Sequence, residues 1–155
     1  MRPLTFPRHE GHLIAALVVC VSLSGCGESG SELEKRAEGR ADETRTLVDD
    51  LAARVGTNPE VKQDATLDCV PGQDDSGLNP TYTVHVATDD TSAARLTSEV
   101  ADELDAEGWT VKRDSVDPSA EEVEVRFAKG EFNVGVLINQ EAGRASVGGS
   151  GGCVR

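Results

Sequence analysis

The sequence predicts an α+β domain of two layers, in which two helices cover one face of a mostly antiparallel sheet. Two segments, 32–55 and 92–107, place apolar residues three and four positions apart, which is typical of amphipathic helices. Several segments after residue 80 alternate apolar and polar residues, as half-buried strands do. Short turns join the last strands and favour an antiparallel meander. The predicted order is helix, strand, strand, helix and then four strands.

Composition limits the possible functions. The chain has 155 residues, with 28 Asp and Glu against 15 Lys and Arg and a formal net charge of −13. An acidic surplus of this size cannot neutralise phosphates, so we expect no nucleic-acid partner. The 37% hydrophobic content suffices for a modest core, although aromatic residues make up only 3%. No apolar run reaches the roughly 20 residues that a membrane-spanning helix needs.

The first predicted helix runs from Glu32 to Val55. Its apolar stripe is Leu33, Ala37, Ala41, Thr44, Val48, Leu51 and Val55. The first half of this stripe contains only Leu and Ala, and Gly39 interrupts it. We therefore expect firm docking only from about Thr44 onward, with a solvated stalk before it.

Two strands should follow. The first is a short strand, 65–70, which carries Cys69 and is followed by a loop rich in breakers over 71–80. In the second strand, Tyr82, Val84 and Val86 alternate with Thr83 and His85, which predicts one buried and one polar side.

The second predicted helix is Ser92 to Glu107, with Leu96, Val100 and Leu104 on its buried face. Gly108 suits the left-handed position after the helix. Trp109 can then pack on Leu104, which predicts a Schellman ending.

Four strands complete the predicted domain. They are Trp109 to Val116, the alternating segments 123–127 and 132–138, and a glycine-rich last strand from Ala145 to Val154 that carries Cys153. A tight turn at 129–131 should join the middle pair.

The start of the chain has the pattern of an export signal. Arg2 and Arg8 lie in a net basic start, and an apolar run of only 11 residues, 13–23, follows. A run this short behind a basic start indicates a cleaved signal and not a membrane span. Leu23-Ser24-Gly25-Cys26 stands at its end: an aliphatic residue, two small residues and a cysteine.

This tetrapeptide resembles the lipobox of bacterial lipoproteins. The resemblance implies that Cys26 carries a diacylglyceryl group, with palmitate among its acyl chains, and that a signal peptidase cuts between Gly25 and Cys26. Residues 1–25 would then be the signal peptide, 26–43 a lipid-anchored flexible tether, and 44–155 a single domain. The alternative is an ordinary signal peptide that happens to end near a cysteine.

The resemblance implies a location at the outer, extracytoplasmic face of the cell membrane. Removal of residues 1–25 leaves 13 basic and 27 acidic residues, a formal charge of −14. Such a chain is repelled by anionic lipid, so attachment would rest on the two acyl chains, at about 0.8 kcal/mol per buried methylene.

An exported domain also favours a disulfide. With Cys20 in the removed segment and Cys26 lipidated, Cys69 and Cys153 remain as an even pair. The bridge would close a loop of about 85 residues, worth roughly 4–5 kcal/mol on the chain-entropy model. A redox or metal pair fits less well because no CxxC is present. We expect the bridge to tie the first strand to the last and seal the glycine-rich strand onto the sheet.

His85 is the only histidine left after residue 25. A hydrolase could be drawn from His85, Asp89 and either Ser76 or Ser92, but no nucleophile elbow or oxyanion donor accompanies them. We therefore expect no catalytic residue.

Two further segments suggest ligands only weakly. Residues 73–77 lack the alternate acids and the final Glu of a calcium loop. The glycine run 148–152 is not followed by the Lys-Ser or Lys-Thr of a phosphate loop. The sequence therefore predicts no metal site and no cofactor.

These observations favour a non-enzymatic binding or accessory module at the cell envelope, whose partner is a protein or a cell-wall component. One alternative is a carrier of a small apolar ligand, which needs a cavity of about 300 Å³ or more between sheet and helices. The other is a hydrolase that uses His85, which needs a hydroxyl and a carboxylate within hydrogen-bond reach of the imidazole.

Overall fold

The computed structural model describes residues 30–114 and 117–155, so the expected signal peptide, Cys26 and its cleavage site lie outside the described residues. The α+β class and the predicted order of elements are confirmed. The elements are α1 (Gly30–Val55), β1 (Thr57–Val70), β2 (Gln73–Ala87), α2 (Ser92–Arg95), a π-helical turn (Leu96–Val100), α3 (Ala101–Ala106), β3 (Thr110–Arg113), β4 (Glu122–Lys129), β5 (Phe132–Asn139) and β6 (Arg144–Ser150).

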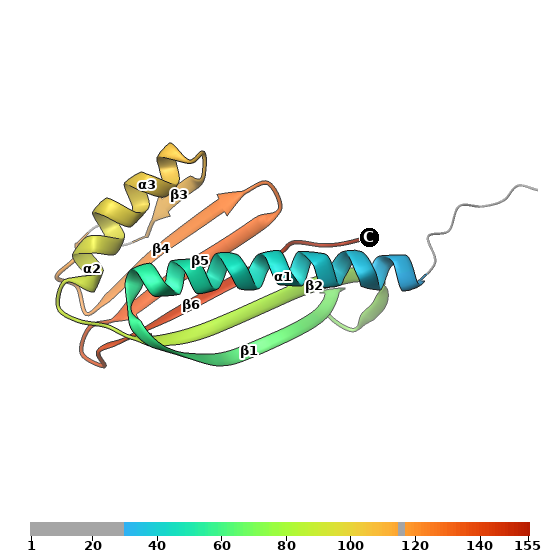
Figure 1. Cartoon of the computed structure of the whole chain (residues 1–155), viewed down its shortest axis with the longest axis horizontal. Helices are drawn as coiled ribbons and strands as arrows, with labels where there is room; N and C mark the ends of the chain where they lie inside the picture. Colours follow the sequence, from blue (N-terminus) through green and yellow to red (C-terminus); the bar gives the residue numbers. More distant parts are fainter. Residues whose placement is uncertain (1–29, 115–116) are drawn as a thin grey trace, which may run out of the picture.

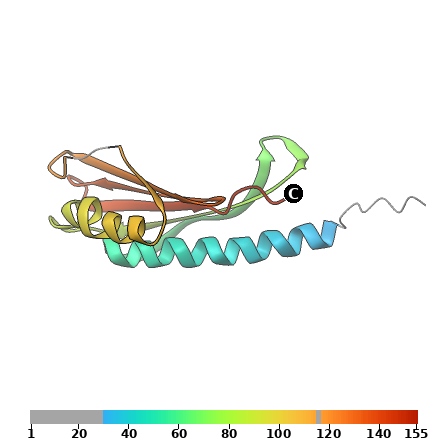
Figure 2. The ribbon, with the colours of Figure 1, turned by 90° about the horizontal axis from the view of Figure 1, so that it is seen from above.

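The sheet has the order β1-β2-β6-β5-β4-β3, and every neighbouring pair is antiparallel. The last strand of the chain therefore lies near the middle of the sheet, between β2 and β5. Both helices cover the same face, and α1 runs along the length of the molecule (Figure 1). Figure 2 shows the helix layer on one side and the opposite side of the sheet without a covering helix.

The core lies between these layers and is built mainly from β-branched residues. Its largest fully buried side chains include Phe127, Leu96 and Ile138. The sheet contributes Val84, Val86, Val123, Val125, Val134, Val136 and Val147, and α1 contributes Val48, Leu51, Ala52 and Val55. The alternation in β2, β4, β5 and β6 directs these residues toward the helices.

Helix α1 docks earlier along the chain than the sequence predicted. Ala37 is 3% exposed and Ala41 is 7% exposed, so the expectation of a solvated stalk up to about Thr44 is wrong for this segment. Small side chains on both partners allow the close approach. A Cβ at Gly151 would lie 2.4 Å from Cγ of Arg40. The weak apolar stripe thus fits a glycine-rich surface.

The second helix contains one wide turn. Its three segments follow each other without a break from Ser92 to Ala106, as predicted for 92–107. The hydroxyls of Thr97 and Ser98 donate to the carbonyl oxygens of Ala93 (3.0 Å) and Ala94 (2.7 Å), respectively. Such back-bonding competes with the helical ladder and is consistent with the π-turn at this point.

The end of this helix is the predicted Schellman motif. Gly108 has a φ of +86° and donates to Asp105 O at 3.0 Å. Trp109 N donates to Leu104 O at 3.0 Å, which is the second bond of the motif.

Asp89 caps the start of the helix. Its Oδ1 accepts hydrogen bonds from the hydroxyl (2.7 Å) and backbone N–H (2.9 Å) of Thr91 and from the Ser92 hydroxyl (3.1 Å). Asp89 N donates in return to Ser92 Oγ. The bonds from Thr91, followed by that from Ser92, hold the pKa of Asp89 below its usual range.

The β1–β2 hairpin is longer than the sequence predicted. The expected loop over 71–80 is wrong: the turn is only Pro71-Gly72, and β2 begins at Gln73. The first strand begins at Thr57, not at Ala65. This strand is largely exposed on both sides, so it lacks the alternation that reveals a strand. Pro80 has no N–H to donate, but it is tolerated inside β2 because its carbonyl oxygen accepts a hydrogen bond from Gly151 N at 3.0 Å.

The last strands also differ in length from the expectation. Strand β3 ends at Arg113, whereas 109–116 was predicted. Strand β6 ends at Ser150, and Gly152, with a φ of +78°, interrupts the pairing. The chain then pairs again with β2, because Val154 and Leu78 exchange hydrogen bonds of 2.8 and 2.9 Å.

The disulfide between Cys69 and Cys153 is confirmed, with 5.7 Å between the Cα atoms. It does not join neighbouring strands, however, because β2 lies between β1 and the segment that follows β6. The bridge crosses β2 at Gly77. A Cβ there would lie 3.1 Å from Cys69 Sγ and 2.5 Å from Val154 O, so the crossing requires a glycine.

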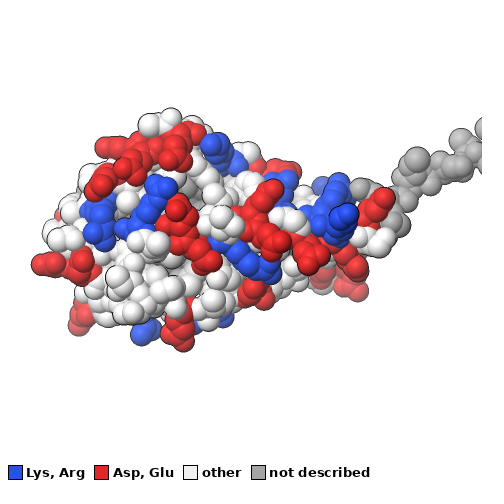
Figure 3. Space-filling view, in the orientation of Figure 1, with Lys and Arg blue, Asp and Glu red and all other residues white. Residues whose placement is uncertain are grey.

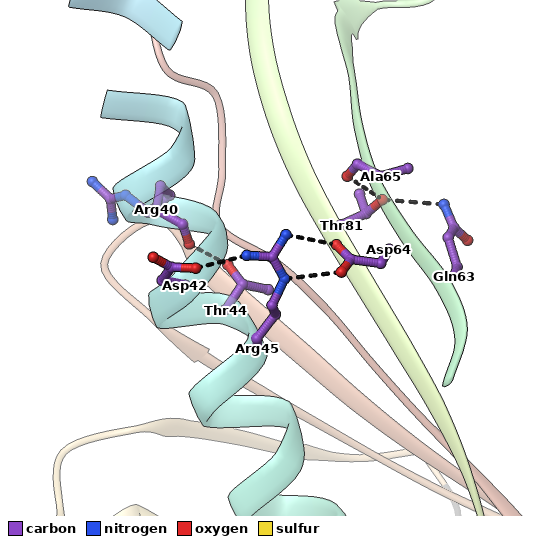
Figure 4. Close-up of polar contacts among 8 residues, drawn as sticks. All are labelled: Arg40, Asp42, Thr44, Arg45, Gln63, Asp64, Ala65 and Thr81. Atoms are coloured by element: carbon purple, nitrogen blue, oxygen red, sulfur yellow. Dashed lines mark hydrogen bonds and ion pairs between the residues drawn. The ribbon is translucent and has the colours of Figure 1, made fainter. Parts of the chain in front are cut away.

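An ion pair fastens β1 to α1 in the same region. The Arg45 guanidinium binds Asp64 with two parallel bonds, Nε to Oδ2 at 3.0 Å and Nη2 to Oδ1 at 2.9 Å (Figure 4). It also binds Asp42 Oδ1 at 2.7 Å. This forked geometry fixes the hairpin relative to the helix.

Candidate binding surface

The helices leave one face of the sheet uncovered, and we call it the open face. Residues that alternate with the buried positions point to this side. On the four strands β1, β2, β6 and β5 they are Glu60, Gln63, Ala65, Leu67, Asn79, Thr81, Thr83, His85, Arg144, Ser146, Gly148, Ser150, Asn133, Gly135, Leu137 and Asn139. Each of them is half-buried or exposed.

At one end of these strands the open face carries two opposite charges, Glu60 paired with His85 and Arg144 paired with Asn139. The other positions, which form the middle of the face, carry no Asp, Glu, Lys or Arg. This is unusual for a chain in which 28% of residues are charged. The helix-covered side is different: acidic and basic side chains are spread along both helices there (Figure 3). The middle of the open face is therefore free of charged side chains, whereas the helix side carries them throughout.

Short side chains make the open face flat. Gln63 Nε2 donates to Thr81 Oγ1 at 3.1 Å, and the Thr81 hydroxyl donates to Ala65 O at 3.2 Å (Figure 4). Thr83 lies against Gly148, where a Cβ would lie only 3.0 Å from Thr83 Oγ1. These contacts hold the side chains close to the sheet.

Ion pairs border the open face. On β3 and β4, Asp114 binds Lys112 at 2.7 Å and Arg126 at 3.3 Å, and Arg126 also binds Glu124 at 2.7 Å. The hydrogen bond from Lys112 is the main reason that the pKa of Asp114 is lowered. The charges at this border thus largely neutralise one another.

The open face is hollowed next to this border. A depression of about 440 Å³ lies over Gly135 and is lined by Thr110, Lys112, Arg126, Ala128 and Asn133, among others. Its floor is backbone and small side chains, since a Cβ at Gly135 would approach nothing closer than Arg126 Cγ at 3.9 Å. The hollow can receive a side chain from a partner.

His85 lies on the open face, and its ring nitrogen Nδ1 is buried without a hydrogen-bond partner among the described residues. The serine and the acid considered with it serve the helix cap: the Ser92 hydroxyl is bound to Asp89, and Ser92 is 1% exposed. Ser76 accepts a bond from Val70 N at 2.8 Å in the hairpin. The serines and the acid that the sequence suggested thus serve other contacts. The cross-strand neighbours of His85 on the open face are Glu60 and Ser146, and among the described residues no hydrogen bond joins either side chain to its Nδ1.

A carrier of a small apolar ligand would need a cavity between the sheet and the helices. A cavity of about 20 Å³ lies there, lined by Leu47, Leu51, Leu104, Trp109, Phe127 and Val134. A pocket for a small apolar ligand has a volume of about 300 Å³ or more. This cavity is far too small for such a ligand.

The described residues hold neither a membrane-spanning helix nor a cluster of metal ligands. Neither helix in 30–114 and 117–155 combines the length and hydrophobicity of a membrane span. Within the same ranges, no three His, Cys, Asp or Glu side chains gather as metal ligands would.

The chain matches no protein-family model, no curated protein and no solved structure.

Sequence reasoning predicted a wetter side of the sheet but missed the lack of charged residues in its middle. The signal is present as the spacings Thr81-x-Thr83-x-His85, Ser146-x-Gly148-x-Ser150 and Asn133-x-Gly135. It becomes visible only when the register places these strands side by side, because β2 and β6 lie about 60 residues apart in the sequence but are neighbours in the sheet.

Proposed function

We propose that this protein is a lipid-anchored, non-enzymatic binding module at the outer face of the cell membrane. It engages a macromolecular partner of the envelope through the open face. The observation that carries this proposal is the uncovered side of the sheet, whose middle lacks charged residues on an otherwise strongly charged chain.

The chemistry of the open face suits a protein interface. Charged residues are depleted from the cores of such interfaces, because their desolvation is costly. The threonine, serine and glycine positions of this surface also lose little side-chain entropy when a partner orders them. A partner would bind through hydrogen bonds to hydroxyl and amide groups, with Leu137 as an apolar contact.

The proposed anchor lies close to the start of α1. Four residue steps separate Cys26 from Gly30, a reach of at most about 14 Å. With 26 residues, α1 extends about 39 Å. Upright on the membrane, the helix would hold the broad part of the sheet well above the lipid surface, where a partner can reach the open face.

The anchor is tested by Cys26→Ala. We expect this variant to remain an unprocessed precursor without lipid, because only the cysteine sulfur can form the thioether that the peptidase recognises. Mass spectrometry of the membrane fraction measures both properties. Efficient cleavage of the variant at the same bond would contradict the lipoprotein assignment.

The binding role is tested by photo-crosslinking in intact cells. A photoreactive residue is placed at Thr83 or Leu137 on the open face, and at exposed Ala94 or Glu99 on the second helix as matched controls. We expect a discrete adduct with one envelope component from the open-face positions only. Equal adducts from the helix positions, or none from the open face, would refute the proposal.

A further inference from the structure

Strand β1 forms one edge of the sheet, and within the described residues no strand pairs with its outer side. Its first part is poorly suited to accept another strand, because the register is irregular between Thr57 and Gln63, and Pro59 and Lys62 lie there. From Gln63 to Asp68 the register is continuous. This second part contains no proline and no basic residue, so its outer backbone groups are open to pairing.

Exposed apolar side chains gather on the same strand. The described residues have four large exposed apolar side chains, and three of them, Val61, Leu67 and Val70, belong to β1. Leu67 is 47% exposed, next to the regular part of the edge. Exposed apolar groups beside an unpaired strand edge are a typical feature of sites that bind extended peptides.

The two sides of the regular segment differ in charge. Gln63, Ala65 and Leu67 point to the open face and are neutral. Asp64 and Asp68 alternate with them and point to the helix side, where Asp64 is bound by Arg45. The whole hairpin region 57–80 contains five acidic residues and one lysine. An added strand would therefore meet neutral neighbours on one side and acidic neighbours on the other.

We propose that β1 binds an extended segment of a partner protein, which adds as a further strand along Gln63–Asp68. Cross-strand neighbours on the same side of a sheet should be complementary. The segment therefore alternates basic residues, on the side of Asp64 and Asp68, with apolar residues, on the side of Ala65 and Leu67. This inference rests on the proposed role as a binding module, but it does not depend on the lipid anchor.

A second copy of this chain is a poor occupant of the same edge. Residues that share a side of the sheet meet across a strand pair, so two copies would bring Asp64 and Asp68 toward the same acids of the partner copy. The net charge of −13 adds a general repulsion. A basic segment, in contrast, is attracted both by Asp64 and Asp68 and by the net negative charge of the chain.

The test uses the full chain in detergent micelles and a synthetic peptide of alternating lysine and valine. We expect the peptide to slow amide hydrogen exchange at alternate residues from Gln63 to Asp68, because only every second N–H of an edge strand points outward. Electrostatic adhesion without strand pairing does not produce this alternation. A glutamate–valine peptide, and a lysine–valine peptide interrupted by proline, should bind at least about tenfold more weakly.

Two exposed leucines provide matched variants. Leu67→Lys places a like charge beside the probe and should weaken its binding about tenfold, whereas Leu137→Lys, 40% exposed on the open face, should leave binding within about twofold. Equal losses in both variants, equal binding of the glutamate peptide, or exchange protection without the alternation would overturn the inference. So would protection of the same amides by self-association without peptide.

Failure of this test is distinguishable from failure of the proposed function. If open-face crosslinks form in cells but the peptide does not bind, only the β1 inference falls. If the peptide binds but no envelope adduct forms, the β1 edge stands and the envelope role falls.

Discussion

The two ends of the molecule are held together by different means. At the wide end, the second helix and the later half of α1 pack on β2 to β6 through buried Val, Ile, Leu and Phe side chains (Figure 1). At the narrow end, the early half of α1 contacts its neighbours through alanine, glycine and ion pairs, and the disulfide joins the distal hairpin to the segment after β6. The difference shows how a chain with few aromatic residues extends a fold beyond the reach of its core: a covalent bond and close backbone contacts replace apolar burial.

The largest expected effect is at the wide end. Phe127 is 2% exposed, and Phe127→Ala should lower the free energy of unfolding by about 3–5 kcal/mol through lost burial and a cavity. Chemical denaturation measures this change. Leu137→Ala on the open face serves as the control, with an expected change within about 0.5 kcal/mol. A loss of less than about 1 kcal/mol in Phe127→Ala would mean that the wide end does not depend on its core in this way.

Removal of the disulfide should act next most strongly, and at the narrow end. In the double variant Cys69→Ala, Cys153→Ala the free energy of unfolding should fall by about 2–4 kcal/mol, because the disulfide no longer constrains the unfolded chain. Hydrogen exchange should accelerate most in 66–80 and after Ser150. Uniform acceleration across β4 and β5 as well would show that the two ends unfold as one unit.

Two glycines of the hairpin, Gly77 and Gly72, can be compared to test whether the disulfide needs a glycine where it passes β2. Gly77 and Gly72 both have positive φ, but a Cβ meets Val154 O and Cys69 Sγ at Gly77 and nothing within 4 Å at Gly72. Backbone strain should therefore lower the free energy of unfolding of both alanine variants by about 1 kcal/mol. The steric clash affects only Gly77→Ala, whose free energy of unfolding should fall by about 1–2 kcal/mol more. Equal losses in thermal denaturation would remove the steric role assigned to Gly77.

The smallest effect concerns the helix cap at the wide end. The pKa of Asp89 is lowered in the folded chain, so its stabilising contribution is complete above the unfolded value of about 3.9 and is lost as the pH falls through the lower folded value. The difference in Tm between the wild-type chain and Asp89→Asn should therefore shrink as the pH falls below about 4. A difference that stays constant with pH would contradict this role.

The wide end is also the part that the sequence predicted best. The helical stripe through Val48 and Leu51, the alternation in β4 and β5, and the Gly108-Trp109 ending are local patterns with a direct physical meaning. The disulfide partners followed from export and elimination. Each of these predictions needed only the chain near the residues concerned or a count of cysteines.

The narrow end could not be predicted in the same way. Strand β1 is exposed on both sides, so its sequence has no alternation, and Pro80 in β2 imitates a loop signal. The insertion of β6 between β2 and β5 depends on contacts between residues far apart in the sequence. The same reason hid the candidate binding surface, since the lack of charged residues in its middle is a property of four strands in register.

The bridge between Cys69 and Cys153 closes residues 69–153 into a covalent ring. The second helix and strands β2 to β6 belong to this ring, whereas α1 and most of β1 are outside it. A protease that cuts once inside the ring, for instance in the exposed segment 117–119, therefore leaves a single molecule still attached to its own amino-terminal helix. A single cut between the end of α1 and Cys69, in residues 56–68, lies outside the ring and would break the covalent link between the ring and α1.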